Sequence, residues 1–398
     1  MAETRAARFS PKITFSAIEA LYWMSMSMAP FQVLFLQSRG LDSVATGQVM
    51  AVISLIGVVM PSLWGFASDR LRSIKRVMIF CILTTALLRL LIPVMSWSPL
   101  GNSTLEVGLL LVMTLFQVGM TPLLDAWLVS LIQRHGNLDY SSIRMWGSLG
   151  YSAVVALMTP LIGWFSVDVV FVVCVVLAMP FLMLCTRQED VKPLTPQEDQ
   201  PKANPMLLLK SFPFVSFLIF STLIYMPTTV VTTYAAYMFE AIGENTNLVG
   251  LLIGLRTVME APGMLLHSRM RKKYRVSAIM LLAAALYVVE MALYQFAGSV
   301  AHLILLGMVD GLCYGLLLPG IVCYAPTLAP ESLRSTAQAL CNVVCNSLAG
   351  VLLGLVGGWM IAAFGARTLY VSVSAVALLG GLLFFISLFV QKRRTGLE

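Results

Sequence analysis

The sequence predicts an all-α membrane protein with twelve transmembrane helices in two pseudo-symmetric six-helix bundles. Composition is the first reason, because 59% of the 398 residues are hydrophobic, 11% are charged and the mean hydropathy is +0.86. A soluble chain has about a quarter of its residues charged, so most of this surface must face lipid. The other two reasons are the length of the apolar windows and the placement of the basic residues.

Twelve apolar windows are long enough to cross the membrane, which takes about 20 residues in a helix. Six of them lie at 13–36, 44–67, 77–96, 105–132, 143–164 and 167–186, and six more at 212–239, 248–267, 276–297, 301–326, 336–362 and 366–390. The predicted domains are a bundle over 1–186, a polar, proline-containing cytoplasmic linker over 187–210 and a second bundle over 211–398. The first apolar run has no small-residue cleavage site, which favours a retained helix over a signal peptide.

The basic residues support this map independently, because cytoplasmic loops of membrane proteins carry an excess of Lys and Arg. With both termini in the cytoplasm, 22 of the 26 Lys and Arg residues lie on the cytoplasmic side. The outer loops hold only Arg39 and Arg367. We therefore expect a multi-pass protein of the plasma membrane, here a bacterial inner membrane, with both termini cytoplasmic.

Several functional classes are excluded by missing motifs. The sequence has no phosphate-binding loop, no nucleophile elbow and no HExxH motif, so we expect neither an enzyme nor an ATPase. Seven cysteines without a CxxC pair, together with only three histidines, predict no disulfide, metal or cofactor. Basic residues interleaved with aromatics are also missing, which argues against nucleic acid as a partner.

A short motif follows the second window, where Gly65, Asp69 and Arg70 precede a basic cluster. Glycine lets helices approach closely, and an Asp can neutralise the N-terminal dipole of a neighbouring helix. An Arg can exchange partners when two halves of a protein move. We interpret these three residues as gating residues, since ordinary positive-inside charge accounts for Arg but not for Gly and Asp.

This motif resembles the loop 2/3 motif of the major facilitator superfamily. Further stretches resemble its proton-coupled branch, which contains lactose permease, phenylpropionate permeases and nucleoside symporters. They begin at Ala29, Thr121, Arg144 and Arg334, and only the Arg-x-Trp-Gly-Ser element at Arg144 is specific to the branch. The resemblance implies two bundles around a central cavity, alternating access, proton coupling, and substrate contact by a helix 4 acid and a helix 5 Arg.

Asp125 and Arg144 match that acid and that Arg, and they also invite pairing on physical grounds. Both lie about equally far from the tip of the loop between two antiparallel helices, which places them at similar depth. An unpaired carboxylate in the membrane costs a few kcal/mol or more, so we expect an ion pair. A purely structural salt bridge is the alternative to a role in substrate binding.

Other ionisable residues within predicted helices are functional candidates by default. Arg256 and Glu260 are one helical turn apart, and together with Asp310 they form the predicted proton-coupling set. Local structural pairing is the alternative. Arg89 and Glu290, at matching places of the two halves, are expected to snorkel or to pair locally, without a function.

The remaining predicted substrate-binding residues are Glu19, Tyr22, Trp23 and Asn342. Aromatic faces suit sugars, nucleobases or phenyl rings, although packing is the commoner role for a single ring in a membrane helix. Glycines at 350, 354 and 358, which follow Asn342 on its predicted helix, predict a close-packing seam.

Together these features predict a proton-coupled symporter for a small polar or aromatic organic solute such as a sugar, a nucleoside or an aromatic acid. Its expected partners are that solute, the proton and the lipid bilayer, and we expect a monomer. The alternatives are an efflux antiporter for drugs or sugars, and a membrane receptor of the same fold that does not transport.

Overall fold

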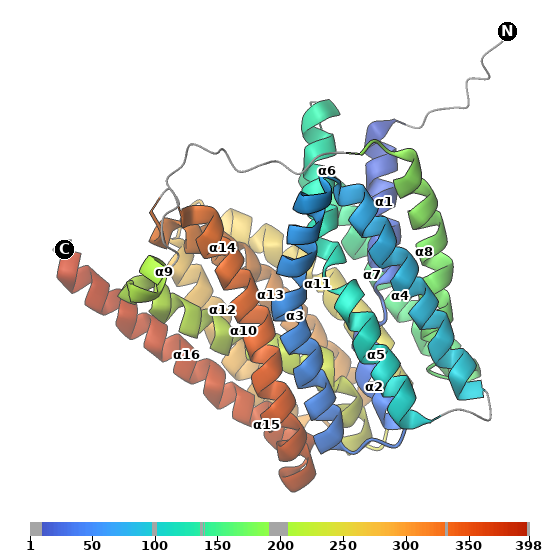
Figure 1. Ribbon diagram of the computed structural model, residues 1–398. Coiled ribbons are helices and arrows are strands. Elements are labelled where there is room, and N and C mark those ends of the chain that lie inside the picture. Colours follow the sequence, from blue (N-terminus) through green and yellow to red (C-terminus); the bar gives the residue numbers. More distant parts are fainter. Residues whose placement is uncertain are drawn as a thin grey trace. The chain divides into compact units, whose positions relative to one another are not determined.

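The computed structural model describes residues 10–97, 102–135, 138, 140–190, 206–330 and 333–395, and every regular element in these ranges is a helix (Figure 1). Ten helices of the described chain are long and apolar enough to cross a membrane. Large apolar side chains such as Phe66, Leu265 and Phe385 are 65%, 63% and 59% exposed, as expected for a surface that faces lipid. The predicted all-α membrane fold is confirmed.

Nine of the twelve predicted windows coincide with one long helix each. These helices are α3 (Ser43–Leu71), α4 (Ile74–Trp97), α7 (Tyr140–Trp164), α8 (Val169–Arg187), α10 (Phe212–Ala241), α11 (Val249–Met270), α12 (Val276–Leu293), α13 (Val300–Tyr324) and α16 (Ala366–Thr395). Short 3-10 turns flank three of them, η2 (Thr246–Leu248), η3 (Tyr294–Phe296) and η4 (Ala325–Leu328), and α9 (Met206–Lys210) precedes α10.

The other three windows are helical but broken. The first consists of α1 (Pro11–Ser25), η1 (Ala29–Phe31) and α2 (Gln32–Ser38), the fourth of α5 (Ser103–Gln117) and α6 (Met120–His135), and the eleventh of α14 (Arg334–Val343), a π-helical turn (Val344–Leu348) and α15 (Ala349–Phe364). Pro30 explains the first break, because its ring would clash with the carbonyl of the preceding turn. Pro122 lies in the first turn of α6, where its missing N–H is tolerated.

By their internal contacts the residues fall into two compact units. The first unit comprises Met1–Ala29 and Val59–Pro196, and the second comprises Pro30–Val58 and Gln197–Glu398. One boundary coincides with the break between α1 and α2, and another lies within α3. The predicted linker boundary at 187–210 stays a prediction, since residues 191–205 lie outside the described chain.

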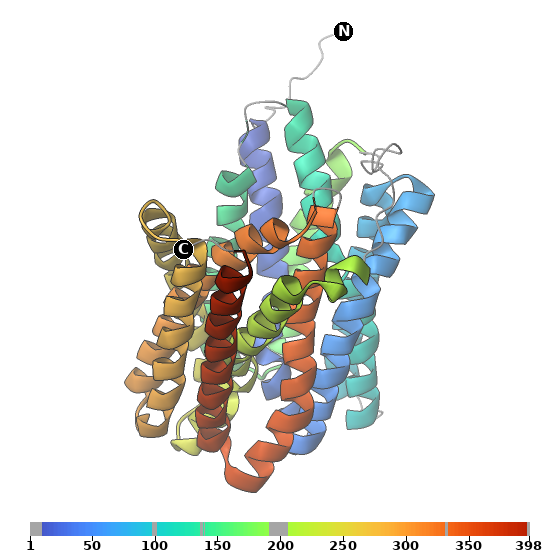
Figure 2. The same ribbon diagram turned by 90° about the vertical axis from the view of Figure 1, so that its left-hand side faces the viewer.

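Within the second unit, the first half of α3 packs against α15 at backbone distance (Figure 1, Figure 2). A Cβ added at Gly354 would lie 2.6 Å from the backbone N of Ala51 and 2.7 Å from the backbone O of Gly47. A Cβ at Gly47 would in turn lie 3.1 Å from Cα of Gly358. The predicted glycine seam is therefore confirmed as a close helix contact.

Gly354→Ala should destabilise the protein, because the new methyl group meets backbone atoms that cannot rotate away. Overpacking of this kind costs about 1–3 kcal/mol, and the melting temperature of the detergent-purified protein should fall. Gly108→Ala is the matched control, since a Cβ at that helical glycine meets no atom within 4 Å. Equal melting temperatures for the two variants would show that the seam is not tight.

Candidate substrate and coupling sites

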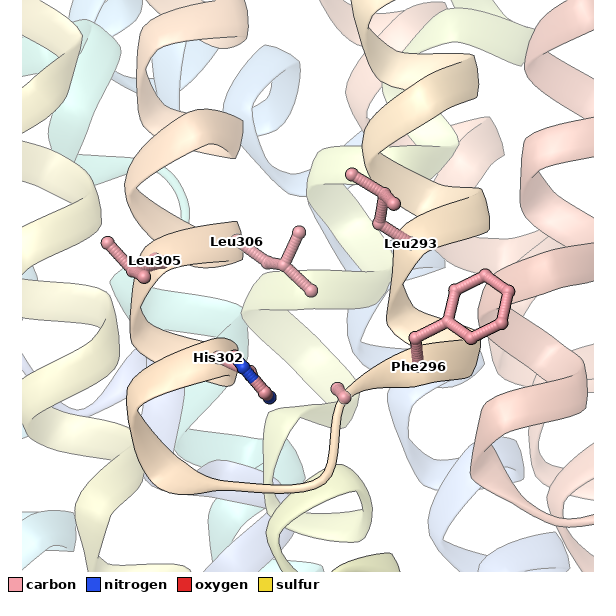
Figure 3. Close-up of a pocket in the computed structure, with 6 residues that line it drawn as sticks. Leu293, Phe296, His302, Leu305 and Leu306 are labelled. Carbon is pink, nitrogen blue, oxygen red and sulfur yellow. The ribbon is translucent and has the colours of Figure 1, made fainter.

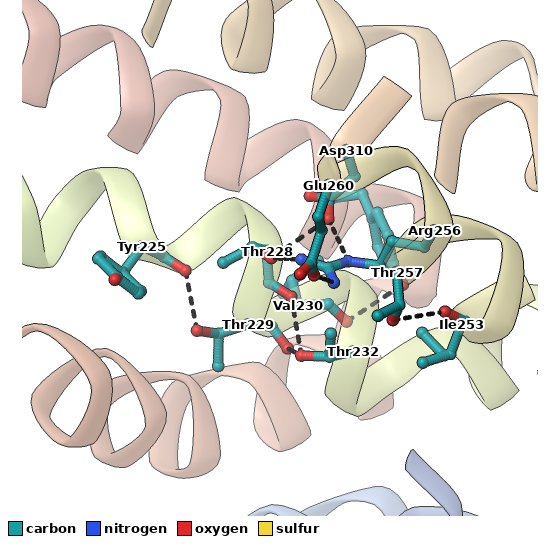
Figure 4. A network of polar contacts seen from close by, with 11 residues as sticks. Tyr225, Thr228, Thr229, Val230, Thr232, Ile253, Arg256, Thr257, Glu260 and Asp310 are labelled. Carbon is teal, nitrogen blue, oxygen red and sulfur yellow. Dashed lines mark hydrogen bonds and ion pairs between the residues drawn. The ribbon is translucent and has the colours of Figure 1, made fainter. Parts of the chain in front are cut away.

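In the second unit, the guanidinium of Arg256 joins three helices (Figure 4). From α11, its Nε lies 2.5 Å from Oδ2 of Asp310 on α13, and its Nη1 lies 2.6 Å from Oε1 of Glu260. Its Nη2 donates to the hydroxyl of Thr228 on α10. That hydroxyl donates in turn to Oδ2 of Asp310 at 3.2 Å. We call these four residues the Arg256 network.

The network is buried, but its members are unequally accessible. The Arg256 and Asp310 side chains are 5% and 0% exposed, whereas that of Glu260 is 15% exposed. The Tyr314 ring lies beneath the guanidinium, 5.1 Å from Cζ. Removing one partner of a buried ion pair costs about 3–5 kcal/mol. The bond between Arg256 and Asp310 therefore stabilises the contact of α11 with α13.

Glycines allow α11 and α13 to come close enough for this ion pairing. A Cβ at Gly311 or Gly315 would collide with the backbone carbonyl of Arg256 or Glu260, and one at Gly263 would lie 2.9 Å from Cα of Gly315. We did not predict this contact from the sequence. The spacing of Gly311 and Gly315, a GxxxG pattern in an apolar helix, is the signal that could have found it.

In the first unit, three predicted residues converge on Gly147 of α7. A Cβ added there would lie 2.5 Å from Cδ1 of Trp23, 3.0 Å from Nη1 of Arg144 and 3.2 Å from Oε2 of Glu19. The Arg144 guanidinium stacks on the Trp23 ring with Cζ 4.2 Å from its centroid. Glu19 is fully buried and, among the described residues, its oxygens have no hydrogen-bond partner, while the charge of Arg144 acts on it.

The expected ion pair between Asp125 and Arg144 is wrong. The Tyr140 hydroxyl donates to Oδ1 of Asp125 at 2.6 Å, and no ion pair between Asp125 and Arg144 is present among the described contacts. Similar depth does not fix the direction of a side chain around its helix. Tyr140 precedes Arg144 by one turn and occupies the place that we predicted for the guanidinium, which lies on Trp23 instead.

A cavity of about 430 Å³ lies within the first unit. It is lined by Pro61, Gly65, Ser68 and Asp69 of α3, Ile74 of α4, and Pro122, Leu123, Asp125, Ala126, Val129 and Ser130 of α6. Predicted gating and substrate-binding residues therefore share one hollow of the size of small-molecule pockets. Within this unit a Cβ at Gly65 would meet no described atom within 4 Å, so its gating role stays a prediction.

The other predicted residues are placed as follows. Arg70 is exposed. Tyr22 is buried, its hydroxyl is hydrogen-bonded to Thr121, and its ring centroid lies 5.5 Å from that of Phe181, which is a packing arrangement. The side chain of Asn342 lies outside the described residues.

Arg89 and Glu290 do not snorkel, because each side chain is buried and 1% exposed. Arg89 donates through Nη1 to the backbone O of Ser25 at 2.7 Å and through Nη2 to Gln117 at 3.2 Å. Ser25 ends α1, so the cation lies at the negative end of a helix dipole. Local pairing is thus confirmed for Arg89, whereas Glu290 has no hydrogen-bond partner among the described residues.

A second cavity, of about 290 Å³, lies between the end of α12 and the start of α13 (Figure 3). It is lined by Leu293, Phe296, Ala297, His302, Leu305 and Leu306. Most of these side chains are apolar, and no residue of the Arg256 network is among them.

Gly147→Ala should lower the melting temperature, because its methyl group would displace Trp23 or Arg144. In a Trp23→Leu background the same substitution should cost less, since the smaller side chain leaves room for the methyl group. Contacting residues characteristically give such non-additive effects, of about 0.5–3 kcal/mol. Fully additive losses in the single and double variants would contradict the convergence of these groups on Gly147.

The chain is similar to known proteins over nearly its whole length. Residues 20–372 match the family described as MFS_1 like. The chain is 25% identical over 377 residues to the maltose permease of Geobacillus stearothermophilus, which covers 94% of this chain and 92% of the permease. It is 21% identical over 392 residues to the uncharacterized transporter YwbF of Bacillus subtilis (strain 168). This match covers 95% of this chain and 94% of YwbF.

Two solved structures are similar in fold. The nucleoside transporter NupG superposes with a TM-score of 0.81 at 14% identity, covering 96% of this chain and 99% of NupG. The POT family transporter PepTSo superposes with a TM-score of 0.75 at 14% identity, covering 97% of this chain and 99% of PepTSo. The chain therefore belongs to the MFS_1 like family and is a multi-pass membrane transporter of the major facilitator type.

Proposed function

We propose that this transporter is a proton-coupled symporter that imports a small polar organic solute by alternating access. The Arg256 network is the observation that carries the proposal. Two carboxylates, Asp310 and Glu260, share one guanidinium inside the membrane, so the group has one excess negative charge that a proton can neutralise. Intramembrane ionisable residues of this kind mark ion and proton pathways.

Glu260 is the member that exchanges the proton in this proposal. Its side chain is the most exposed of the charged three, and its Oε1 accepts from Nη1 of Arg256 at 2.6 Å. Asp310 is fully buried and is held by both Arg256 and Thr228. Release of Glu260 from the guanidinium would leave its carboxylate ready to take up a proton.

A sugar is the favoured substrate class. The cavity of the first unit presents carboxylates of Asp69 and Asp125 and hydroxyl oxygens of Ser68 and Ser130. Because both serines donate to backbone carbonyls, all four groups offer acceptors to the hydroxyl groups of a sugar. The similarity to a maltose permease supports the same class. The partly exposed Trp23 and Arg144 would add to the binding surface of this unit, and the fully buried Glu19 would act through Arg144.

Gating is assigned to Gly65, Asp69 and Arg70, at the end of α3. Asp69 lines the cavity, so a contact that it makes in another conformation would close the hollow. We also propose the bacterial inner membrane as location, with both termini cytoplasmic, because of the positive-inside distribution of Lys and Arg, and a monomer as the working form.

Transport measurements distinguish the proposed symport from two other functions. An efflux antiporter would deplete its solute from energised cells, whereas the proposed symporter accumulates it. A receptor of the same fold would bind the solute without flux into proteoliposomes. Uptake of radiolabelled maltose and of a nucleoside, with and without an inward proton gradient, distinguishes the three.

Glu260→Gln should abolish uphill accumulation while exchange of preloaded substrate continues, because exchange does not require the proton to be discharged. Glu240→Gln is the control, since Glu240 is an exposed acid at the end of α10 outside the Arg256 network. Counterflow and gradient-driven uptake are measured in the same proteoliposomes. Accumulation by Glu260→Gln at the wild-type level would show that Glu260 is not the exchanging site.

A further inference from the structure

A second buried acid lies behind the Arg256 network. Glu290 projects from α12 and is 1% exposed. Neither of its oxygens has a hydrogen-bond partner among the described residues, and Oδ1 of Asp310 has none either. A buried carboxylate that is ionised and unpaired is strongly unfavourable in a medium of low dielectric constant.

The ionisable groups that face Glu290 come from four elements besides its own helix. They are Tyr287 of α12, Tyr294 of η3, Asp310 and Cys313 of α13, Arg256 of α11 and Tyr370 of α16. Only Arg256 is a cation. Its guanidinium is already bonded to Asp310 and Glu260, so three carboxylates would compete for one positive charge.

Two tyrosines lie near this acid in the sequence of its helix and the turn that follows. Tyr287 and Tyr294 lie one turn before and one turn after Glu290, on the same helical face. Both hydroxyl groups are buried and lack a partner among the described residues. Tyr370 differs, because its hydroxyl donates to the backbone O of Val230 at 3.3 Å. Buried polar groups normally have partners, and a proton on Glu290 would remove the cost of an ionised carboxylate that has none.

We propose that Glu290 is a resident proton site, a carboxyl group that carries a proton while Asp310 is ionised and bonded to Arg256. When Arg256 leaves Asp310, the O–H bond of Glu290 breaks and an O–H bond forms on Asp310 through a bridging water molecule. Glu290, which would otherwise be left ionised and buried, then takes up another proton from water. This inference rests on the proposed proton coupling and adds an acid that passes its proton to the Arg256 network.

The test measures protonation separately from transport. Infrared spectra of the purified transporter in H₂O and in D₂O should show a protonated carboxyl C=O band that is absent from Glu290→Gln and present in Glu240→Gln. Glu290→Gln should also keep the wild-type melting temperature, because glutamine resembles the protonated acid. A retained band, or a large loss of stability as expected for an ionised and paired Glu290, would overturn the proposal.

Transport then decides whether the proton is used. Glu290→Gln should lose gradient-driven accumulation and retain counterflow, and accumulation at the wild-type level would overturn the role in coupling. A wild-type protein that accumulates no tested solute in response to a proton gradient would instead count against the proposed symport. The infrared band would still establish or refute the proton on Glu290, so the two failures are distinguishable.

Discussion

The second unit depends on how one buried positive charge is compensated. Arg256 holds Asp310 at 2.5 Å and Glu260 at 2.6 Å, and it reaches α10 through Thr228. Helices α11 and α13 can approach closely enough for these bonds only because Gly311 and other glycines remove side chains from their contact. Close packing and charge pairing therefore support each other, since neither is possible at a larger separation of the helices.

In the first unit, the partly exposed Arg144 and the buried Arg89 are compensated differently. Arg144 lies on the face of Trp23, where the ring quadrupole attracts a cation, and Arg89 lies at the carbonyl end of α1. Neither Arg forms a salt bridge with Asp125 in the described structure. Asp125 lines the cavity and accepts a hydrogen bond from Tyr140. This difference is the basis for assigning substrate binding to the first unit and proton exchange to the second.

Hydropathy predicted the helices well and their interruptions poorly. Each apolar window proved helical. The break around Pro30 does not change the mean hydropathy of its window, so hydropathy alone cannot detect it. The Arg256–Glu260 pair follows from spacing along one helix, whereas the bond to Asp310 depends on tertiary packing of α11 against α13. The sequence predicts no function for Glu290, because burial of a side chain cannot be inferred from a single apolar sequence.

Asp310 is tolerated inside the second unit only because Arg256 compensates its charge. A double-mutant cycle of Arg256→Gln and Asp310→Asn, measured as unfolding free energy in detergent, tests it most directly. We predict that Arg256→Gln alone is strongly destabilising and that adding Asp310→Asn recovers at least about 1 kcal/mol, because the stranded carboxylate is removed. If the two losses add instead, the guanidinium and Asp310 do not depend on each other and the account is wrong.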